Sequence, residues 1–196
     1  MKHDTELGDV LLTLARAAIG DRLGVVARAA PSHVALAADG ATFVTLRMGG
    51  ELRGCIGTLE AHRALGADVR ANAVAAAFRD PRFTPLTFGE FTATAIEVSV
   101  LGRSEPLPAV DERDALARLR PGVDGVILAC GHRRATFLPQ VWEQLPDPRE
   151  FLAALKRKAG MPASFWSPEM RVSRYTVASW QQAEFDSELE AVEAKR

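Results

Sequence analysis

The chain has 196 residues, of which 47% are hydrophobic and 25% are charged, and its formal net charge at pH 7 is −1. This length supports one sizeable core, and the composition is that of a soluble globular protein rather than a disordered one. The small net charge argues against nonspecific nucleic-acid binding, which relies on a positively charged surface.

The start of the chain has no signal-peptide character, since residues 1–9 carry charges where a signal peptide needs an apolar core. The longest purely apolar run, residues 73–78, is far shorter than the about 20 residues that span a bilayer. We therefore expect a cytoplasmic protein without membrane contact. In that reducing compartment the two cysteines, Cys55 and Cys130, should both be free thiols.

The first predicted elements are a helix and a hairpin. Apolar residues between positions 7 and 19 recur at steps of three and four, which predicts an amphipathic helix. Residues 41–48 alternate in polarity and reach the turn Gly49-Gly50, after which a second extended run follows. Cys55 should thus lie on the second strand of a hairpin.

A second helix and a third strand are predicted next. Residues 61–79 are rich in alanine and read as a helix, which Pro81 stops because its ring clashes with the preceding turn. Residues 80–82 should therefore open a loop at the helix end. Residues 95–101 alternate between apolar and polar, as a half-exposed strand does.

The second half of the chain repeats this alternation of hairpins and helices. A short helix near 111–119 and the turn 121–125 lead into a predicted hairpin of residues 126–129 and 135–138. Asp147, a proline after it and a glutamate three residues beyond it predict the start of a helix from about 148 to 159.

The C-terminal part should hold one more strand. Residues 170–177 can form it, and residues 181–196 form a polar tail. Strands that arrive as hairpins, with helices between them, favour an α+β fold with a predominantly antiparallel sheet and flanking helices.

The segment from Arg53 to Leu59 places a thiol between two glycines, directly after a cationic side chain. Glycine occurs inside an extended segment where the chain bulges, or where another backbone or a ligand comes close. Gly54 and Gly57 therefore indicate an exposed backbone beside Cys55, and Arg53 would favour the thiolate if it points the same way. Alternatively Cys55 is a small buried hydrophobic residue, as most free cysteines are.

With Leu52, this segment reads Leu-Arg-Gly-Cys-Ile-Gly and resembles the signature of the AMMECR domain family, whose bacterial and archaeal members are called protein A of the AmmeMemoRadiSam system. The resemblance covers roughly residues 5 to 180 and continues through residues 80–83, 85–86, 122–125, 136–141, 158–160 and 174–175. It implies a single two-lobed domain over residues 1–180, with a cleft near the cysteine signature.

The resemblance and the residues together predict one site. Cys55 is the candidate catalytic residue, as nucleophile or ligand contact, and the candidate substrate-binding residues are Arg53, Gly54, Gly57, Asp80, Arg82 and Asp124. The arginines would bind an anionic group, and the glycine amides would stabilise negative charge. Asp80 could instead be a helix cap or a loop salt bridge. Family members carry histidine or aspartate at the position of Asp124, which leaves an acid/base role for it in doubt.

The resemblance also implies partners, a Memo-type protein and a radical S-adenosylmethionine enzyme. Any iron–sulfur cluster would belong to the latter, because two cysteines cannot hold one. We expect no cofactor, and no metal either, since Cys130-Gly131-His132 reads as a hairpin turn rather than as a ligand set.

Three functions remain open on the sequence. The first is an enzyme or substrate-binding protein of unassigned substrate. The second is a noncatalytic adaptor in which Cys55 is packed. The third is an RNA-directed role, which would need a local basic surface such as residues 132–134.

Overall fold

The computed structural model describes residues 4–25 and 32–182 of the chain. Two compact units divide it: the first combines Met1–Val100 with Ala178–Arg196, and the second is Leu101–Val177. Each unit is built on a four-stranded sheet whose hairpins are antiparallel. The predicted α+β class with antiparallel sheets is therefore confirmed.

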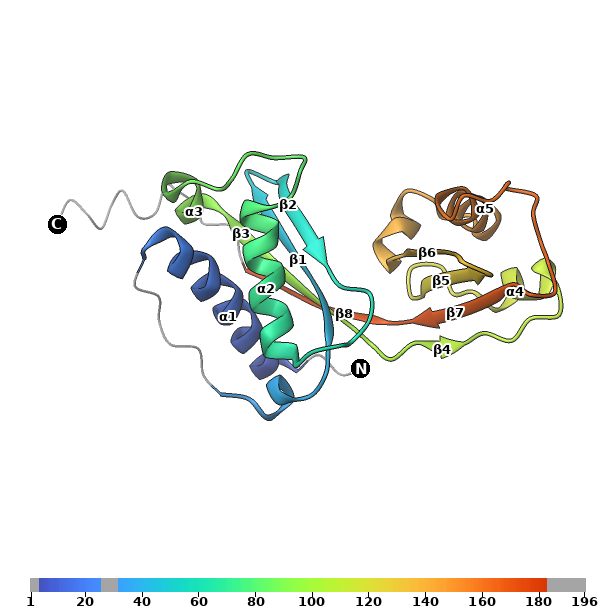
Figure 1. Cartoon of the computed structure of the whole chain (residues 1–196), viewed down its shortest axis with the longest axis horizontal. Helices are drawn as coiled ribbons and strands as arrows, with labels where there is room; N and C mark the ends of the chain where they lie inside the picture. The colour runs from blue at the N-terminus through green and yellow to red at the C-terminus, as the bar shows by residue number, and fades with distance from the viewer. Residues whose placement is uncertain (1–3, 26–31, 183–196) are drawn as a thin grey trace. The chain divides into compact units, whose positions relative to one another are not determined.

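The first unit consists of a sheet with two long helices on one face. Its strands, in the order β2-β1-β3-β8, are β1 (Ala41–Met48), β2 (Glu51–Gly57), β3 (Ala95–Leu101) and β8 (Val177–Gln181). Its helices are α1 (Thr5–Leu23), the short 3-10 helix η1 (Val34–Ala37), α2 (Leu65–Phe78) and α3 (Phe88–Ala93). Helices α1 and α2 lie side by side against the sheet (Figure 1). Strand β2 lies at the edge of the sheet.

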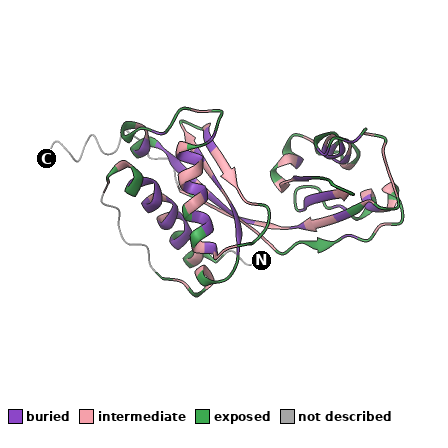
Figure 2. Ribbon diagram, in the orientation of Figure 1, coloured by how far each residue is buried: buried purple, intermediate pink, exposed green. Residues whose placement is uncertain are grey.

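Helix α1 has a clear start and end. The Asp4 carboxylate accepts a hydrogen bond from the Leu7 amide at 3.1 Å, and Gly24 ends the helix with a φ of 75°. One side of the helix is buried against α2 and the sheet (Figure 2). The helix predicted from residues 7–19 is thus confirmed, and it is one turn longer at the C-terminal end.

The core of the first unit lies between the helices and the sheet. Val44 and Leu46 of β1 and Ile96 and Val98 of β3 are fully buried there. Because side chains alternate along a strand, Thr45 and its partner Cys55 project from the opposite face of the sheet. The cysteine of the signature is therefore outside the core of its own unit.

The hairpin of β1 and β2 contains an irregularity at the signature. Thr45 pairs with Cys55 and Leu46 with Gly54, but Arg47 pairs with Leu52. Arg53 is therefore an extra residue without a partner on β1, which defines a β-bulge. The predicted hairpin is confirmed, and the bulge is an addition to it.

Two helical predictions differ from the structure in the first unit. The helix expected over 61–79 begins only at Leu65, because residues 61–64 form a loop that bridges back to Asp39. Helix α3 was absent from the prediction, although Thr87 and Glu90 form a capping box at its start.

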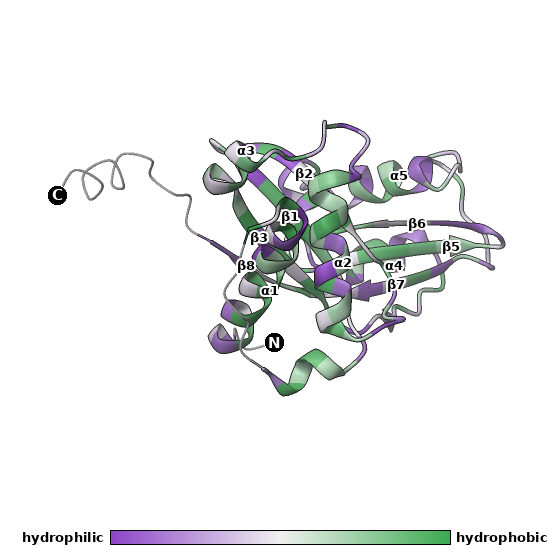
Figure 3. Ribbon diagram, turned by 60° about the vertical axis from the view of Figure 1, so that its left-hand side comes forward, coloured by the Kyte–Doolittle hydropathy of each residue, from purple (hydrophilic) through white to green (hydrophobic). Residues whose placement is uncertain are grey.

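The second unit also packs helices on a sheet. Its strands, in the order β4-β7-β5-β6, are β4 (Glu105–Pro106), β5 (Gly125–Cys130), β6 (Arg133–Phe137) and β7 (Arg171–Tyr175), and its helices are α4 (Glu112–Arg118), the 3-10 helix η2 (Pro139–Glu143) and α5 (Pro148–Lys158). Phe151 of α5 is fully buried, stacked on Trp142 with ring centroids 3.7 Å apart. Strand β5 is largely hydrophobic, as expected for a strand inside the sheet (Figure 3).

The last predicted strand is divided in two. The run expected over 170–177 forms β7, breaks at Thr176 and continues as β8, which belongs to the other sheet. The tail predicted from residue 181 lies, from residue 183 onward, outside the described residues. Among the helices that the structure describes, none is long and apolar enough to cross a bilayer.

Candidate functional site

Cys55 lies on the edge strand β2, half-buried. Its Sγ accepts a hydrogen bond from the hydroxyl of Thr45, the residue opposite on β1, with 3.4 Å between Oγ1 and Sγ. This contact fixes the direction in which the thiol points.

The Asp80–Arg82 pair binds the outer edge of β2 at Cys55. The Cys55 amide donates to Oδ2 of Asp80 at 2.9 Å, and the Cys55 carbonyl accepts from Nη2 of Arg82 at 3.3 Å. Two side chains of one loop thus satisfy both peptide groups that a neighbouring strand would otherwise bind. Asp80 and Arg82, two of the candidate site residues, therefore contact Cys55 directly.

The two members of this pair differ in exposure. The Asp80 side chain is only 2% exposed, whereas that of Arg82 is 53% exposed. Nε and Nη2 of Arg82 donate to the carboxylate at 2.9 and 2.6 Å. Hydrogen bonds from Arg82 hold the pKa of Asp80 well below its usual range, and the Cys55 amide adds to this effect. The same carboxylate raises the pKa of Arg82. The negative end of the pair is buried and its positive end faces outward.

Arg53, the bulge residue, is engaged elsewhere. Its Nε and Nη2 donate to the two carboxylate oxygens of Glu90 at 2.9 and 3.2 Å, and Nη2 also donates to the Thr84 carbonyl at 3.0 Å. The bonds that Glu90 accepts from Arg53, and after them those from Thr87, lower the pKa of Glu90 to about 2. The sequence suggested Arg53 as the cation beside the thiol. In the structure the guanidinium that contacts the Cys55 residue belongs to Arg82.

The two glycines of the signature serve close packing. A Cβ at Gly54 would collide with the Ala76 carbonyl of α2, and a Cβ at Gly57 would collide with the Phe43 ring. Because the Cys55 amide turns outward, alternation turns the Gly54 amide toward β1 and the Gly57 amide outward. Of the two amides proposed to stabilise negative charge, only that of Gly57 therefore faces away from the ladder.

Asp124 lies in the second unit, in the turn before β5, and is fully buried. Its carboxylate accepts from the Arg120 amide at 2.9 Å and from Nη2 of the same residue at 2.6 Å, and Arg174 lies 3.9 Å away. The Asp124 carbonyl accepts from the Trp142 indole at 2.7 Å. These contacts fix the turn. A role for Asp124 in a site shared with Cys55 remains a prediction.

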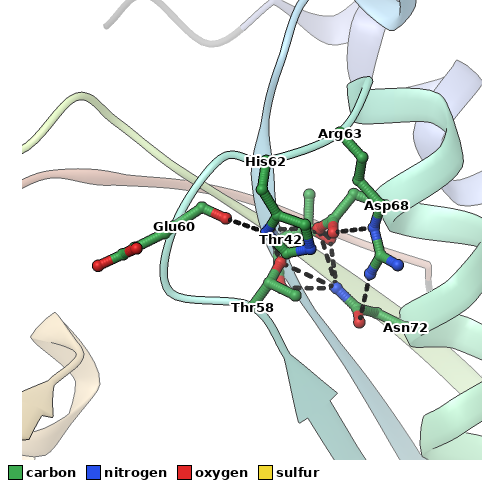
Figure 4. A network of polar contacts seen from close by, with 7 residues as sticks. All are labelled: Thr42, Thr58, Glu60, His62, Arg63, Asp68 and Asn72. Carbon is green, nitrogen blue, oxygen red and sulfur yellow. Dashed lines mark hydrogen bonds and ion pairs between the residues drawn. The ribbon is translucent and has the colours of Figure 1, made fainter.

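A buried polar network around Asp68 supports the far end of the hairpin and escaped the sequence analysis. Oδ2 of the fully buried Asp68 accepts from the Thr42 backbone amide and hydroxyl at 2.8 and 2.6 Å, from the Thr58 hydroxyl at 2.7 Å and from the side-chain amide of Asn72 at 2.9 Å (Figure 4). Oδ1 accepts from Arg63 at 2.7 Å. The network ties α2 to β1 and to the residue that follows β2. Spacing could not reveal it, because Asp68 and Asn72 of α2 find their partners Thr42 and Thr58 only through the fold.

His62 is the histidine nearest to Cys55 in the sequence. It is exposed, and its Nδ1 lies 2.8 Å from the Glu60 carbonyl (Figure 4). Within residues 4–25 and 32–182, no three His, Cys, Asp or Glu side chains gather in a group that could hold a metal ion.

Comparisons with known proteins place these residues in a family. A family model described as AMMECR1 matches residues 12–180. A protein of Methanothermobacter thermautotrophicus is 42% identical over 135 residues, 68% of this chain and 70% of that protein. One of Aeropyrum pernix is 37% identical over 190 residues, 90% of this chain and 79% of that protein. The crystal structure of an uncharacterised protein from Pyrococcus horikoshii matches with a TM-score of 0.79 and 30% identity, covering 91% of this chain and 93% of that one.

Proposed function

Because this chain belongs to the AMMECR1 family, we propose that it is the protein A component of an AmmeMemoRadiSam system, and that a substrate binds at its Cys55. The component acts as an enzyme or as a substrate-binding protein. Its site comprises the Cys55 thiol, the Asp80–Arg82 pair and the outward-facing amide of Gly57.

The single observation that supports this proposal best is the way the Asp80–Arg82 pair binds both peptide groups of Cys55. Burying a carboxylate is costly unless it is paired and fully hydrogen-bonded, so four donors converging on Asp80 mark a position that is held rigidly. The residue held is one whose thiol lies outside the core of its unit. Fixed main chain beneath a half-buried thiol is what a binding or nucleophilic cysteine requires.

Within this site Arg82 supplies the exposed positive charge. The buried Asp80 carboxylate holds the Arg82 guanidinium in place. Because Asp80 is buried and hydrogen-bonded, a ligand does not contact its charge. An anionic group of the substrate would therefore meet Arg82 first, and a charge that develops during a reaction could be stabilised by the Gly57 amide.

The noncatalytic adaptor is the competing function, and it needs a contiguous apolar surface for docking. Within the part of the chain that the structure describes, the large apolar side chains that are exposed lie in five separate segments: Val34, Leu59, Phe88, Val110 and Val123. Three of them belong to the first unit and two to the second, so no single described segment of the chain supplies an adaptor surface.

The proposal is tested by ligand retention. The purified chain is incubated with a small-molecule extract of bacterial cells, freed of unbound material and examined by native mass spectrometry. We expect the wild-type chain to retain a compound that Cys55→Ser and Arg82→Gln lose and that the matched Cys130→Ser variant keeps. An identical set of retained compounds in all four proteins would overturn the proposal.

The proposed system also predicts partners. We expect a weak complex with the Memo-type protein or with the radical S-adenosylmethionine enzyme, which would own any iron–sulfur cluster. Isothermal titration calorimetry with each purified partner, with and without the retained compound, measures it. Absence of heat in every combination would remove the support for a role in this system and leave the thiol site to be judged alone.

A further inference from the structure

Phe83 contacts both arginines of the signature site, and this cluster bears on the substrate class; the inference rests on the proposed function. The Cζ atoms of Arg53 and Arg82 lie 5.9 and 5.4 Å from the centroid of the Phe83 ring. Both guanidinium groups therefore contact one aromatic side chain, next to the strand that carries Cys55.

In each arginine the same two nitrogens of the guanidinium group, Nε and Nη2, already bind a carboxylate. Nε and Nη2 of Arg53 face Glu90, and Nε and Nη2 of Arg82 face Asp80. The second hydrogen of each Nη2 lies toward a backbone carbonyl, that of Thr84 or that of Cys55. The donor group that each arginine retains for a ligand is thus Nη1.

The Nη1 group of Arg53 is buried and has no hydrogen-bond acceptor among the described residues. The Arg53 side chain is 8% exposed, so water of the bulk solvent does not satisfy this donor. A buried guanidinium nitrogen without an acceptor is unfavourable, and an incoming oxygen atom would remove that cost. This donor points to a ligand that carries an oxygen acceptor.

The charges of the site limit which acceptor fits. Each arginine is matched by one carboxylate, so the four side chains have no net charge, and Arg82 is the most exposed of the four. A phosphate dianion would need surplus positive charge, and the Nε–Nη2 fork that could bind it is occupied in both arginines. A carboxylate carries a single charge and can bind through one oxygen to a single Nη1 donor.

We propose that the substrate of the Cys55 site is a small carboxylic acid, whose carboxylate binds Nη1 of Arg82 while its neighbouring carbon faces the thiol. Nη1 of Arg53 is buried, so the carboxylate reaches this second donor only after the side chains that cover it move. Phosphorylated compounds fit this cluster less well, because a phosphate dianion would meet no surplus positive charge.

Two alkylating agents of similar size test this directly. Iodoacetate carries a carboxylate and iodoacetamide does not, and with each the thiolate forms a C–S bond while the C–I bond breaks and iodide leaves. The measured quantity is the ratio of the two rates at Cys55, iodoacetate over iodoacetamide, from peptide-resolved mass spectrometry. We expect this ratio to be about fivefold to tenfold higher in the folded wild-type chain than at the same cysteine in urea-unfolded protein.

Two variants distinguish binding of a carboxylate by Arg82 from the effect of removing any exposed, paired arginine. Arg82→Gln keeps a hydrogen bond to Asp80 and removes the positive charge. The reaction of Cys55 with iodoacetate should then slow more than the reaction with iodoacetamide, and the ratio should return to its value in the unfolded protein. The control is Arg118→Gln, since Arg118 is also paired with an aspartate and is 51% exposed, and here the ratio should not change. If Arg82→Gln fails to fold, the double variant Asp80→Asn/Arg82→Gln removes the buried charge as well.

A measurement on the wild-type chain makes the same comparison without substitutions. Acetate should protect Cys55 from iodoacetamide more than sulfate does at equal ionic strength. Equal ratios in folded and unfolded protein, with Cys55 still reactive, would overturn the carboxylic-acid inference and leave the proposed function intact. A Cys55 that reacts with neither reagent in the folded chain would overturn both.

Discussion

At the scale of single residues, Gly54 shows how one position can serve packing in a segment that reads as functional. The sequence suggests a backbone left open for a ligand, but the space beside Gly54 is filled by the Ala76 carbonyl of α2. The absent side chain lets the helix lie directly on strand β2. Through this contact α2 fixes the strand that presents Cys55 on the other face of the sheet.

Replacing Gly54 by alanine should destabilise the fold by about 2 to 3 kcal/mol, because the new methyl group must push α2 away from the sheet. Urea unfolding followed by circular dichroism measures the change. The matched control is Gly89→Ala in helix α3, where a Cβ would meet nothing within 4 Å and alanine should be neutral or slightly stabilising. Equal effects of the two substitutions would refute the packing role.

The Arg53–Glu90 ion pair makes a contribution to stability that depends on pH. The pKa of Glu90 falls from 4.5 to about 2 in the folded chain. The ionised carboxylate therefore stabilises the fold fully at pH values above 4.5, the pKa of the unfolded chain. Glu90→Gln keeps the capping hydrogen bonds of α3 but removes the charge. At neutral pH it should reduce the free energy of unfolding by about 1 to 3 kcal/mol.

The difference between wild type and Glu90→Gln should shrink as the pH falls from 4.5 toward 2, because the wild-type carboxylate then becomes protonated. Chemical denaturation at a series of pH values measures this. A difference that stays constant over this range would mean that the loss comes from geometry and not from charge.

The sequence was informative about the residues of the site and less so about their directions. The motifs identified Cys55, Asp80 and Arg82, and the structure brings these three together. The sequence did not predict that the Arg53 side chain binds Glu90. A bulge shifts the alternation of side chains by one residue, and the bulge depends on pairing with β1, which the local pattern does not encode.

At the scale of elements, the helices and strands with strong periodicity were predicted correctly. Helix α5 begins at Pro148 after the Asp147 cap, as its start signals indicate, and the β1–β2 hairpin turns at Gly49-Gly50. Helix α3 has six residues, too few for periodicity to show, so only its capping box could have identified it. Strand β8 follows β7 after a single residue, and a change of sheet leaves no mark in the local pattern.

The Asp68 network joins elements that the sequence separates, and it should be decisive for the first unit. Asp68→Ala leaves the Arg63 guanidinium, the Thr42 amide and hydroxyl and the Thr58 hydroxyl without the carboxylate that accepts from them. We expect a loss of about 3 to 5 kcal/mol in the free energy of unfolding.

Thermal and urea unfolding measure this loss, with Asp114→Ala as the control. Asp114 also pairs with an arginine, but at the surface, and its removal should have a much smaller effect. Similar losses for the two variants would show that the network contributes no more than an exposed ion pair.

At the scale of the whole molecule, the chain contains two units, each with its own hydrophobic core and its own sheet. The second unit is inserted between strands β3 and β8, which are neighbours in the first sheet. Local patterns revealed the hairpins and helices of both units but not this insertion, because it is defined by pairing between residues 95–101 and 177–181. The predicted cleft that would unite Asp124 with Cys55 depends on both units and stays a prediction.

Each unit also contains one free cysteine, so the molecule holds its own reference for the central claim that Cys55 is presented to a ligand. The most direct test is the rate of iodoacetamide labelling of Cys55 and Cys130, resolved by peptide, in the folded chain at neutral pH. We predict that Cys55 reacts several times faster than Cys130, that Arg82→Gln slows Cys55 alone, and that the difference disappears in urea. The account is contradicted if Cys55 stays unlabelled until the protein unfolds and Cys55→Ser alters only thermal stability, since the sulfur would then be packing and nothing more.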